Sequence, residues 1–310
     1  MDALVAGGRR LLDGLLTAWA AVTFTFFALR MAAGDPLAGL LSQGLATPEQ
    51  VEALRASLGL DHPLGQQYVD FLRGLIRGEF GTSLYTGRDV TRVIWEQFPA
   101  TAQLALASLG LAMILGLIFG VLAAWKERSL IGALAANIAG LATGLPVAFT
   151  GIIAILLFSI LFQLLPDRNL HWLDDLLLPS LVLGYASSGA IARIVHSGLA
   201  ETMRAPYILA ARARGISSPT RLLWHALRPA LPPVIALTAL EAAFLFAGTV
   251  VTETVFSRPG LGRLLVSSIV QGDFPIAQGI VVLAAVVYTA SQVVADAAAI
   301  ALDPRLRRRA

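Results

Sequence analysis

Long runs of apolar residues with few charges alternate along the chain with short polar loops and one long polar segment. Each run has at least the roughly 20 residues that an α-helix needs to cross a bilayer. The runs cover residues 11–33, 101–125, 130–165, 176–194, 231–252 and 276–302. The pattern therefore predicts an all-α membrane protein with about six transmembrane helices.

Two of these runs allow more than one interpretation. The run at 130–165 has no charged residue and is too long for one straight crossing. Gly144-Leu145-Pro146 predicts a kink or a break in it, which leaves either one long tilted helix or an interfacial stretch followed by a span. The first run resembles a cleaved signal peptide near Ala32-Ala33, but it is long for that role and five further runs follow.

The polar segment at 34–99 predicts a small, mostly helical domain outside the membrane. Apolar residues recur with helical spacing at 49–58 and at 66–76. Thr47 followed by Pro48 is typical of a helix start, with threonine as the N-cap and proline at the first helical position. Glycines inside the apolar runs favour close packing of membrane helices.

Charge placement predicts the topology. Only 14% of the residues are charged, and Lys126 is the single lysine, so arginine carries almost all of the positive charge. Short loops with an excess of arginine face the cytoplasm, which places both termini inside and the 34–99 segment outside. We divide the chain into 1–98 (first helix and extracytoplasmic segment), 99–303 (five helices with a cytoplasmic loop at 199–232) and 304–310 (basic cytoplasmic tail).

Signatures of catalysis are missing from the sequence. There are no cysteines, no Gly-x-x-x-x-Gly-Lys loop for ATP and no His-Glu-x-x-His zinc motif. An intramembrane enzyme would need Ser188 to meet His196, two turns apart on one helix and about 12 Å by helical rise. We therefore expect a non-catalytic chain without metal, cofactor or nucleic acid. A secondary transporter that works alone is a distant alternative, because ionisable residues in the spans are few.

The loop between the fourth and fifth runs carries the most information. Its middle predicts a short basic amphipathic helix at about 207–214, ended by Gly215 as the residue after the helix. Ser217-Ser218-Pro219 then predicts the start of a second helix that carries Leu222, Leu223 and Leu227. An ordinary positively charged loop that lies on anionic lipid would show the same charges.

The residues Tyr207-Ile-Leu-Ala-Ala-Arg-Ala-Arg-Gly215, followed by His225-Ala-Leu-Arg228, resemble the cytoplasmic loop of ABC importer permeases. The general pattern is Glu-Ala-Ala, three residues, Gly, nine residues, Ile, one residue, Leu-Pro. Ala210, Ala211, Gly215 and Leu227 match it, whereas Leu209, His225 and Arg228 depart from it. These departures resemble those of the first permease subunit of peptide and nickel importers.

Further motifs resemble the same family, in the same order along nearly the whole chain. They are Gly34-Asp35-Pro36, Leu58-Gly-Leu-Asp61, Glu79-Phe-Gly-Thr-Ser83, Thr254-Val-Phe256, Arg258-Pro-Gly-Leu-Gly-Arg263, Asp273-Phe-Pro275 and Asp303-Pro-Arg-Leu-Arg307. Each motif is weak by itself. Their order, at the expected places of the topology, makes the resemblance specific.

The resemblance implies that the loop helix docks onto a cytoplasmic ATPase subunit and acts as a lever. Ala210 and Ala211 would let the helix sit close to that partner, and Gly215 would permit the turn between two helices. Arg212, Arg214 and Arg221 would pair with acids of the ATPase. The implied assembly has a second homologous permease, two ATPase subunits that bind ATP and Mg²⁺, and an extracytoplasmic solute-binding protein, all at the bacterial inner membrane.

Two further sets of residues are expected along the pathway. The loop with Phe256, Pro259, Gly260 and Leu261 either re-enters the membrane as part of an outer gate or forms a plain surface hairpin. Glu241 and Asp296 lie inside apolar runs, where a charge costs about 2.5–3.5 kcal/mol, so each should face the bundle interior or a wet path. The alternative is a hydrogen-bonded contact between helices.

Peptides are the commonest cargo of the family that the chain resembles, and nickel, alone or chelated, is the alternative. The binding protein mostly sets this choice, so the substrate is not readable from this chain.

Overall fold

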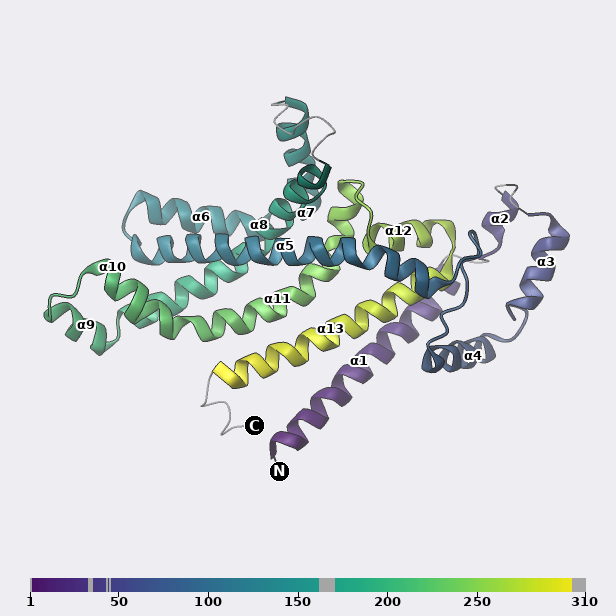
Figure 1. Cartoon of the computed structure of the whole chain (residues 1–310), viewed down its shortest axis with the longest axis horizontal. Helices are drawn as coiled ribbons and strands as arrows, with labels where there is room; N and C mark the ends of the chain where they lie inside the picture. The colour runs from purple at the N-terminus through teal and green to yellow at the C-terminus, as the bar shows by residue number, and fades with distance from the viewer. Residues whose placement is uncertain (1, 33–35, 43, 45, 162–170, 303–310) are drawn as a thin grey trace. The chain divides into compact units, whose positions relative to one another are not determined.

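The fold is almost entirely helical in the computed structural model, which describes residues 2–32, 36–42, 44, 46–161 and 171–302 (Figure 1). The helices that precede the long loop are α1 (Asp2–Ala32), α2 (Ala38–Ser42), α3 (Pro48–Ser57), α4 (Leu64–Arg77), α5 (Val90–Trp125), α6 (Leu130–Gly144), α7 (Val147–Ala154) with the π-helical η1 (Ile155–Leu161), and α8 (His171–Met203). They are followed by α9 (Pro206–Ala213), α10 (Ser218–Thr220), the π-helical η3 (Arg221–Ala226), α11 (Leu227–Val255), α12 (Leu261–Gln271) and α13 (Phe274–Leu302).

Five helical segments in the described ranges are long and apolar enough to cross a membrane: Leu12–Met31, Val90–Trp125, Asp175–Met203, Ser218–Val255 and Phe274–Ala295. The pair α6 and α7 gives a sixth span if it counts as one, although it bends by 110° at the break. Leu145 has an extended backbone at this break, and Pro146, which has no N–H to donate, precedes α7. The predicted all-α fold and the predicted break are thus confirmed.

Helices α5 and α8 extend well beyond the apolar runs that predicted them. Helix α5 begins at Val90 rather than at 101, because the Asp89 carboxylate accepts the Arg92 backbone N–H at 2.9 Å and so caps a polar first part of the helix. Helix α8 continues to Met203 rather than ending near 194. Apolarity marks only the part of a helix that lies in hydrocarbon, so it underestimates helices that continue into water.

The chain forms two compact units. The first comprises residues 1–10, 102–258 and 290–310, and the second comprises 11–101 and 259–289. Residues 259–289, which the sequence division grouped with the five later helices, therefore pack with the N-terminal part of the chain.

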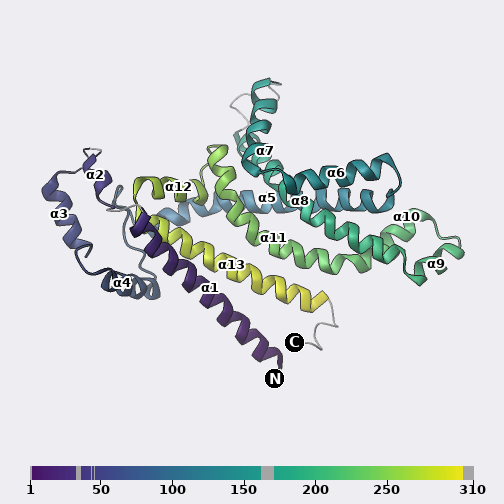
Figure 2. The same ribbon diagram turned by 180° about the vertical axis from the view of Figure 1, so that it is seen from behind.

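In the first unit, α8 packs against both α6 and α11 (Figure 2). Glycines permit close contact between α5 and α8. A Cβ placed on Gly120 would lie 2.6 Å from the Val195 side chain, and one placed on Gly116 would lie 2.6 Å from Ile191. These positions admit no larger residue without movement, as expected for small residues where membrane helices meet.

In the second unit, Thr47 caps α3 in the predicted way: its hydroxyl accepts the Gln50 N–H, and the Gln50 side chain accepts the Thr47 N–H. The turn before α13 is held to the loop at 79–89. Asp273 is buried and accepts the Ser83 hydroxyl at 2.6 Å and the Leu84 N–H at 3.2 Å. The Tyr85 hydroxyl donates to the Gln271 carbonyl.

Some predicted features lie outside the described residues. These are Gly34 and Asp35 of the Gly-Asp-Pro motif, the Asp303–Arg307 motif, and the basic tail at 304–310.

Candidate functional site

The loop between α8 and α11 begins with a short, firmly terminated helix. Helix α9 has Pro206 at its first position and runs to Ala213, which confirms the helix predicted at 207–214. Gly215 follows with φ +77°. The Gly215 N–H donates to the Arg212 carbonyl at 3.0 Å, and the Ile216 N–H donates to the Ala211 carbonyl at 3.2 Å. This pair of bonds is a Schellman motif, and its left-handed residue favours glycine.

The second helical part of the loop, α10 followed by η3, starts at Ser217, as predicted. Hydrogen bonds from side chains hold its first residues in place. The Ser217 and Thr220 hydroxyls share a hydrogen bond of 2.8 Å, and the Arg221 guanidinium donates to the Ile216 carbonyl. The Trp125 indole at the end of α5 donates to the Ser218 hydroxyl at 3.3 Å. The turn between α9 and η3 is therefore fixed by side chains as well as by the backbone.

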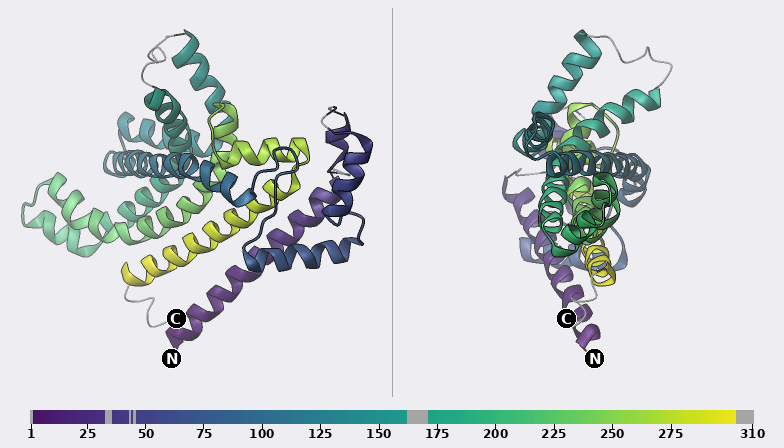
Figure 3. Two further views of the ribbon diagram at one scale, coloured as in Figure 1. Left: turned by 45° about the vertical axis from the view of Figure 1, so that its right-hand side comes forward. Right: turned by 90° about the vertical axis from the view of Figure 1, so that its left-hand side faces the viewer.

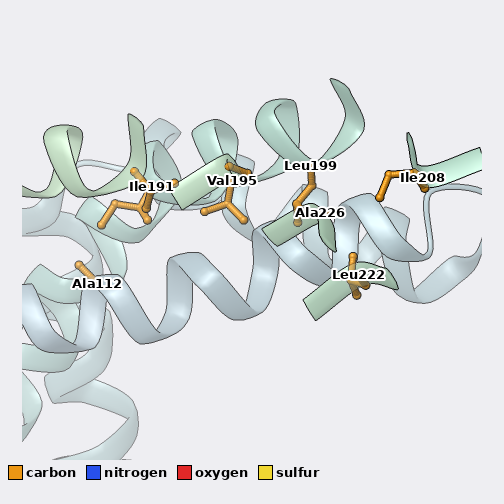
Figure 4. Close-up of a cluster of buried hydrophobic side chains, with 9 residues drawn as sticks. Ala112, Ile191, Val195, Leu199, Ile208, Leu222 and Ala226 are labelled. Atoms are coloured by element: carbon orange, nitrogen blue, oxygen red, sulfur yellow. The ribbon is translucent and has the colours of Figure 1, made fainter. Parts of the chain in front are cut away.

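One side of this loop belongs to a cluster of nine buried apolar residues in the first unit (Figure 4). Ile208 of α9, 3% exposed, packs in the same cluster as Leu199 of α8 and Leu222 of η3. The cluster also contains Ala112 of α5 and Val234 of α11. The α9 helix is thus packed into the same core as the long helices α5, α8 and α11.

The opposite side of the loop is exposed and partly apolar. Tyr207 (47% exposed), Leu209 (59%), Leu223 (53%) and Trp224 (71%) are large side chains that this unit leaves uncovered. Arg212 and Arg214 are also exposed. An exposed apolar surface edged by positive charge is typical of a protein–protein docking site.

The structure separates the predicted coupling residues into two groups. Tyr207, Ala210, Arg212 and Arg214 are on the exposed side, whereas Ala211 is buried inside the chain and Leu227 packs against the buried cluster. Arg221 is half-buried and hydrogen-bonded to the Ile216 carbonyl. Ala211 is 6% exposed, so the chain itself covers this side chain in the structure, and its predicted place against a partner stays a prediction. Sequence reasoning also missed Trp224 and the exposure of Leu209.

Of the two acids predicted in apolar spans, Glu241 lies half-buried on α11, close to the Ser187 side chain of α8. It therefore takes part in a contact between two helices. Asp296 is in α13, but its side chain is outside the part of the chain whose side chains the structure describes.

The segment predicted as an outer gate contains a helix, so it is not a plain hairpin. Phe256 ends α11 and packs with Leu178 and Val182 of α8. Pro259 is exposed, Gly260 is extended, and Leu261 begins α12, with its N–H donating to the Thr101 hydroxyl at 2.8 Å.

A buried charged pair next to Phe256 was not predicted. Glu253 is fully buried and Arg258 is 7% exposed, and the Arg258 N–H donates to the Glu253 carbonyl at 2.9 Å. Burial lowers the pKa of Arg258, while the negative charges of Glu253 and Asp175 oppose that change. Arg258 is therefore within electrostatic reach of both the last turn of α11 and the beginning of α8.

No group of three or more metal-ligating side chains occurs among the described residues. The Ser188 hydroxyl donates to the Tyr185 carbonyl at 2.7 Å, a bond within its own helix.

Within the described ranges, five membrane-length helices, a sixth broken one, and a loop helix with an exposed apolar and basic face define a multi-pass membrane protein. Two family models match the chain. Residues 116–308 match the binding-protein-dependent transport system inner membrane component, and residues 8–105 match the N-terminal part of the membrane component of such systems. The chain belongs to this family, and it is a multi-pass permease subunit of the bacterial inner membrane.

Curated relatives match over nearly their whole length. A probable peptide ABC transporter permease of Sinorhizobium fredii is 33% identical, covering 96% of this chain and 98% of its own. The di/tripeptide transport system permease DppB of Pseudomonas aeruginosa is 34% identical, with 96% and 97% covered. The glutathione transport system permease GsiC of Escherichia coli is 33% identical, with 96% and 97% covered.

Proposed function

We propose that this chain forms half of the translocation pathway of an ATP-driven importer of peptides. The observation that carries the proposal is the two-sided loop helix: Leu209 is 59% exposed on one side, and Ile208 is packed into the core of the long helices on the other. The relatives named for peptides, di/tripeptides and glutathione support peptides over nickel as the cargo.

In this proposal the exposed side of α9 and η3 docks onto a cytoplasmic ATPase subunit. Leu209 and Trp224 enter an apolar groove, and Arg212 and Arg214 pair with acidic side chains at its edge. When two ATPase subunits close around ATP and Mg²⁺, they displace α9. Because Ile208 and Ala211 are buried against the chain's own helices, the displacement reaches α8 and α11. This chain itself binds no ATP and catalyses no reaction.

In the same proposal, the segment that follows α11 serves substrate entry on the extracytoplasmic side. A solute-binding protein delivers the peptide, and a second homologous permease completes the pathway. Phe256, Pro259, Gly260 and Leu261 form this chain's part of the outer gate, held by the Glu253–Arg258 pair at the end of α11. Glu241 and Asp296 remain candidates for contact with a cationic group of the substrate.

The function is tested in vesicles that contain this chain, its partner permease, both ATPase subunits and the binding protein. We expect ATP-dependent accumulation of labelled di- and tripeptides and no accumulation of free or chelated nickel. Accumulation of nickel alone would replace the peptide assignment. Uptake that follows an ion gradient without ATP would contradict the proposal as a whole.

The docking surface is tested with Leu209→Ala, and Leu106→Ala of α5 is the matched control because it is also an exposed leucine, at 68%. We expect Leu209→Ala to weaken the copurification of the ATPase subunits by about tenfold, the size typical of an apolar residue at the centre of an interface. Leu106→Ala should not change it. Equal retention of the ATPase by both variants would refute docking through this face.

A further inference from the structure

Helix α4 is strongly amphipathic, yet none of its residues is buried in the structure. One side of the helix is polar and carries Gln66, Asp70, Arg73 and Arg77. The other side is apolar and carries Leu64, Tyr68, Val69, Phe71, Leu72, Leu75 and Ile76. The apolar side is wider than a helix needs for packing against one neighbour, so part of it requires another partner.

The middle of the apolar side packs on α1, in the same unit (Figure 3). The Tyr68 and Thr23 hydroxyls share a hydrogen bond of 2.6 Å. The rings of Tyr68 and Phe71 lie 5.2 and 5.3 Å from the ring of Phe26. The Arg30 guanidinium donates to the Gln67 side-chain oxygen at 3.1 Å. These contacts attach α4 to α1 at several points.

The contacts with α1 place α4 at membrane depth. The apolar span of α1 is Leu12–Met31. Thr23 lies about 12 Å before the end of that span by helical rise, and the hydrocarbon layer is about 30 Å thick. A helix about 10 Å wide whose Tyr68 reaches Thr23 cannot lie wholly in water. The mutual bond of the two hydroxyls also suits a site without water.

A stripe of the apolar side next to the α1 contact is uncovered. Val69 is 43% exposed and Ile76 is 87% exposed, with the half-buried Leu72 between them. Their spacing of three and four residues places them on one line of the helix. On α1, Phe24 (75%) and Met31 (81%) are likewise apolar side chains that the chain leaves exposed.

We propose that α4 is an interfacial helix whose Val69–Leu72–Ile76 stripe contacts the acyl chains of the membrane leaflet around the C-terminal end of α1. The arginines of its polar side then lie at the level of the lipid head groups, as in helices that rest in a membrane surface. The lipid anchors the segment that joins the first two spans. With the N-terminus inside, this leaflet is the extracytoplasmic one.

The test uses the natural absence of cysteine, because each single-cysteine variant then has one thiol. Ile76→Cys and Asp70→Cys of the full chain, assembled with cysteine-free partners in lipid nanodiscs, receive a nitroxide label. We expect the ratio of oxygen to nickel-chelate accessibility to be at least fivefold higher at position 76 than at position 70. Asp70 is the matched control because it is an exposed residue on the polar side of the same helix.

A second measurement avoids the bulk of the label: the rate at which each unlabelled thiol reacts with a membrane-impermeant maleimide. We expect the thiol at position 76 to react at least tenfold more slowly, both with and without the binding protein. Equal rates at the two positions would overturn the proposal. Protection of position 76 only after the binding protein is added would also overturn it, because the stripe would then be a protein-docking surface.

Discussion

The turn after α9 allows a test that separates backbone strain from side-chain size. Gly215 has φ +77°, and a Cβ placed on it would meet no atom within 4 Å. A substitution there costs free energy through the backbone alone, about 1–2 kcal/mol for alanine in the left-handed conformation. Asparagine tolerates this conformation, so its cost should be smaller, and a β-branched valine should cost the most.

Tryptic cleavage after Arg212 measures this cost. Arg212 is exposed, but cleavage requires local opening of the helix end. When opening is fast relative to cleavage, the rate follows the opening equilibrium, so 1.4 kcal/mol corresponds to a tenfold change. We expect Gly215→Ala to be cleaved about 5–30 times faster than the wild type. Gly215→Asn should be cleaved more slowly than Gly215→Ala, and Gly215→Val should be cleaved fastest of the three.

Whether Gly215→Ala or Gly215→Asn is cleaved faster decides between backbone strain and side-chain size as the cause. Asparagine is larger than alanine, so a steric effect would make Gly215→Asn the more damaging of the two. Faster cleavage in Gly215→Asn than in Gly215→Ala would therefore refute the argument from backbone strain. Gly215→Asp extends the series, because aspartate also tolerates the turn. We expect that variant to insert normally and to lose coupled uptake, through its negative charge beside the docking surface.

Three further predictions concern other parts of the chain. Ile208→Ala should destabilise the detergent-solubilised protein by about 2–5 kcal/mol and lower its thermal midpoint, because the side chain is 3% exposed; an unchanged midpoint would contradict its place in the core. Asp273→Ala should cost about 1–3 kcal/mol for each donor left unpaired, and Asp273→Asn less, in the same assay. Burial and the charge of Asp273 raise the pKa of Tyr85 above its ordinary value of 10.0. The stability that the un-ionised Tyr85 side chain contributes is complete below pH 10 and is lost as the pH rises through the raised pKa. Protease resistance of the 79–89 loop should therefore fall in that pH range in the wild type and not in Tyr85→Phe.

Local signals were sufficient for the helix ends and turns that the sequence predicted. Thr47 and Pro48 at the start of α3, Pro146 after the break, and Gly215 after α9 each act on the backbone within a few residues. Their effect does not depend on distant parts of the chain. The same independence explains why the pattern predicted the loop helix almost to the residue.

Features that depend on distant residues were not predictable in this way. Ala210 and Ala211 have the same side chain, and only the packing of α9 within the folded chain determines that Ala211 is the buried one. Ser83 and Asp273 are hydrogen-bonded although 190 residues separate them. The end of α8 was predicted too early because Ser197 and Glu201, which lie on its polar continuation, interrupt the apolar pattern without interrupting the helix.

The position of Ile208 limits how the proposed coupling to an ATPase subunit can work. A loop that only lay on the membrane surface could move without its spans, because lipid offers little resistance to sideways movement. Here Ile208 shares one close-packed cluster with Leu199 of α8, Leu222 of η3 and Val234 of α11. Packed interiors transmit displacement because their side chains have few voids to move into. A partner that moves α9 must therefore either move α8 and α11 with it or open a cavity at Ile208. Since a cavity there costs several kcal/mol, movement of the spans is the more favourable response.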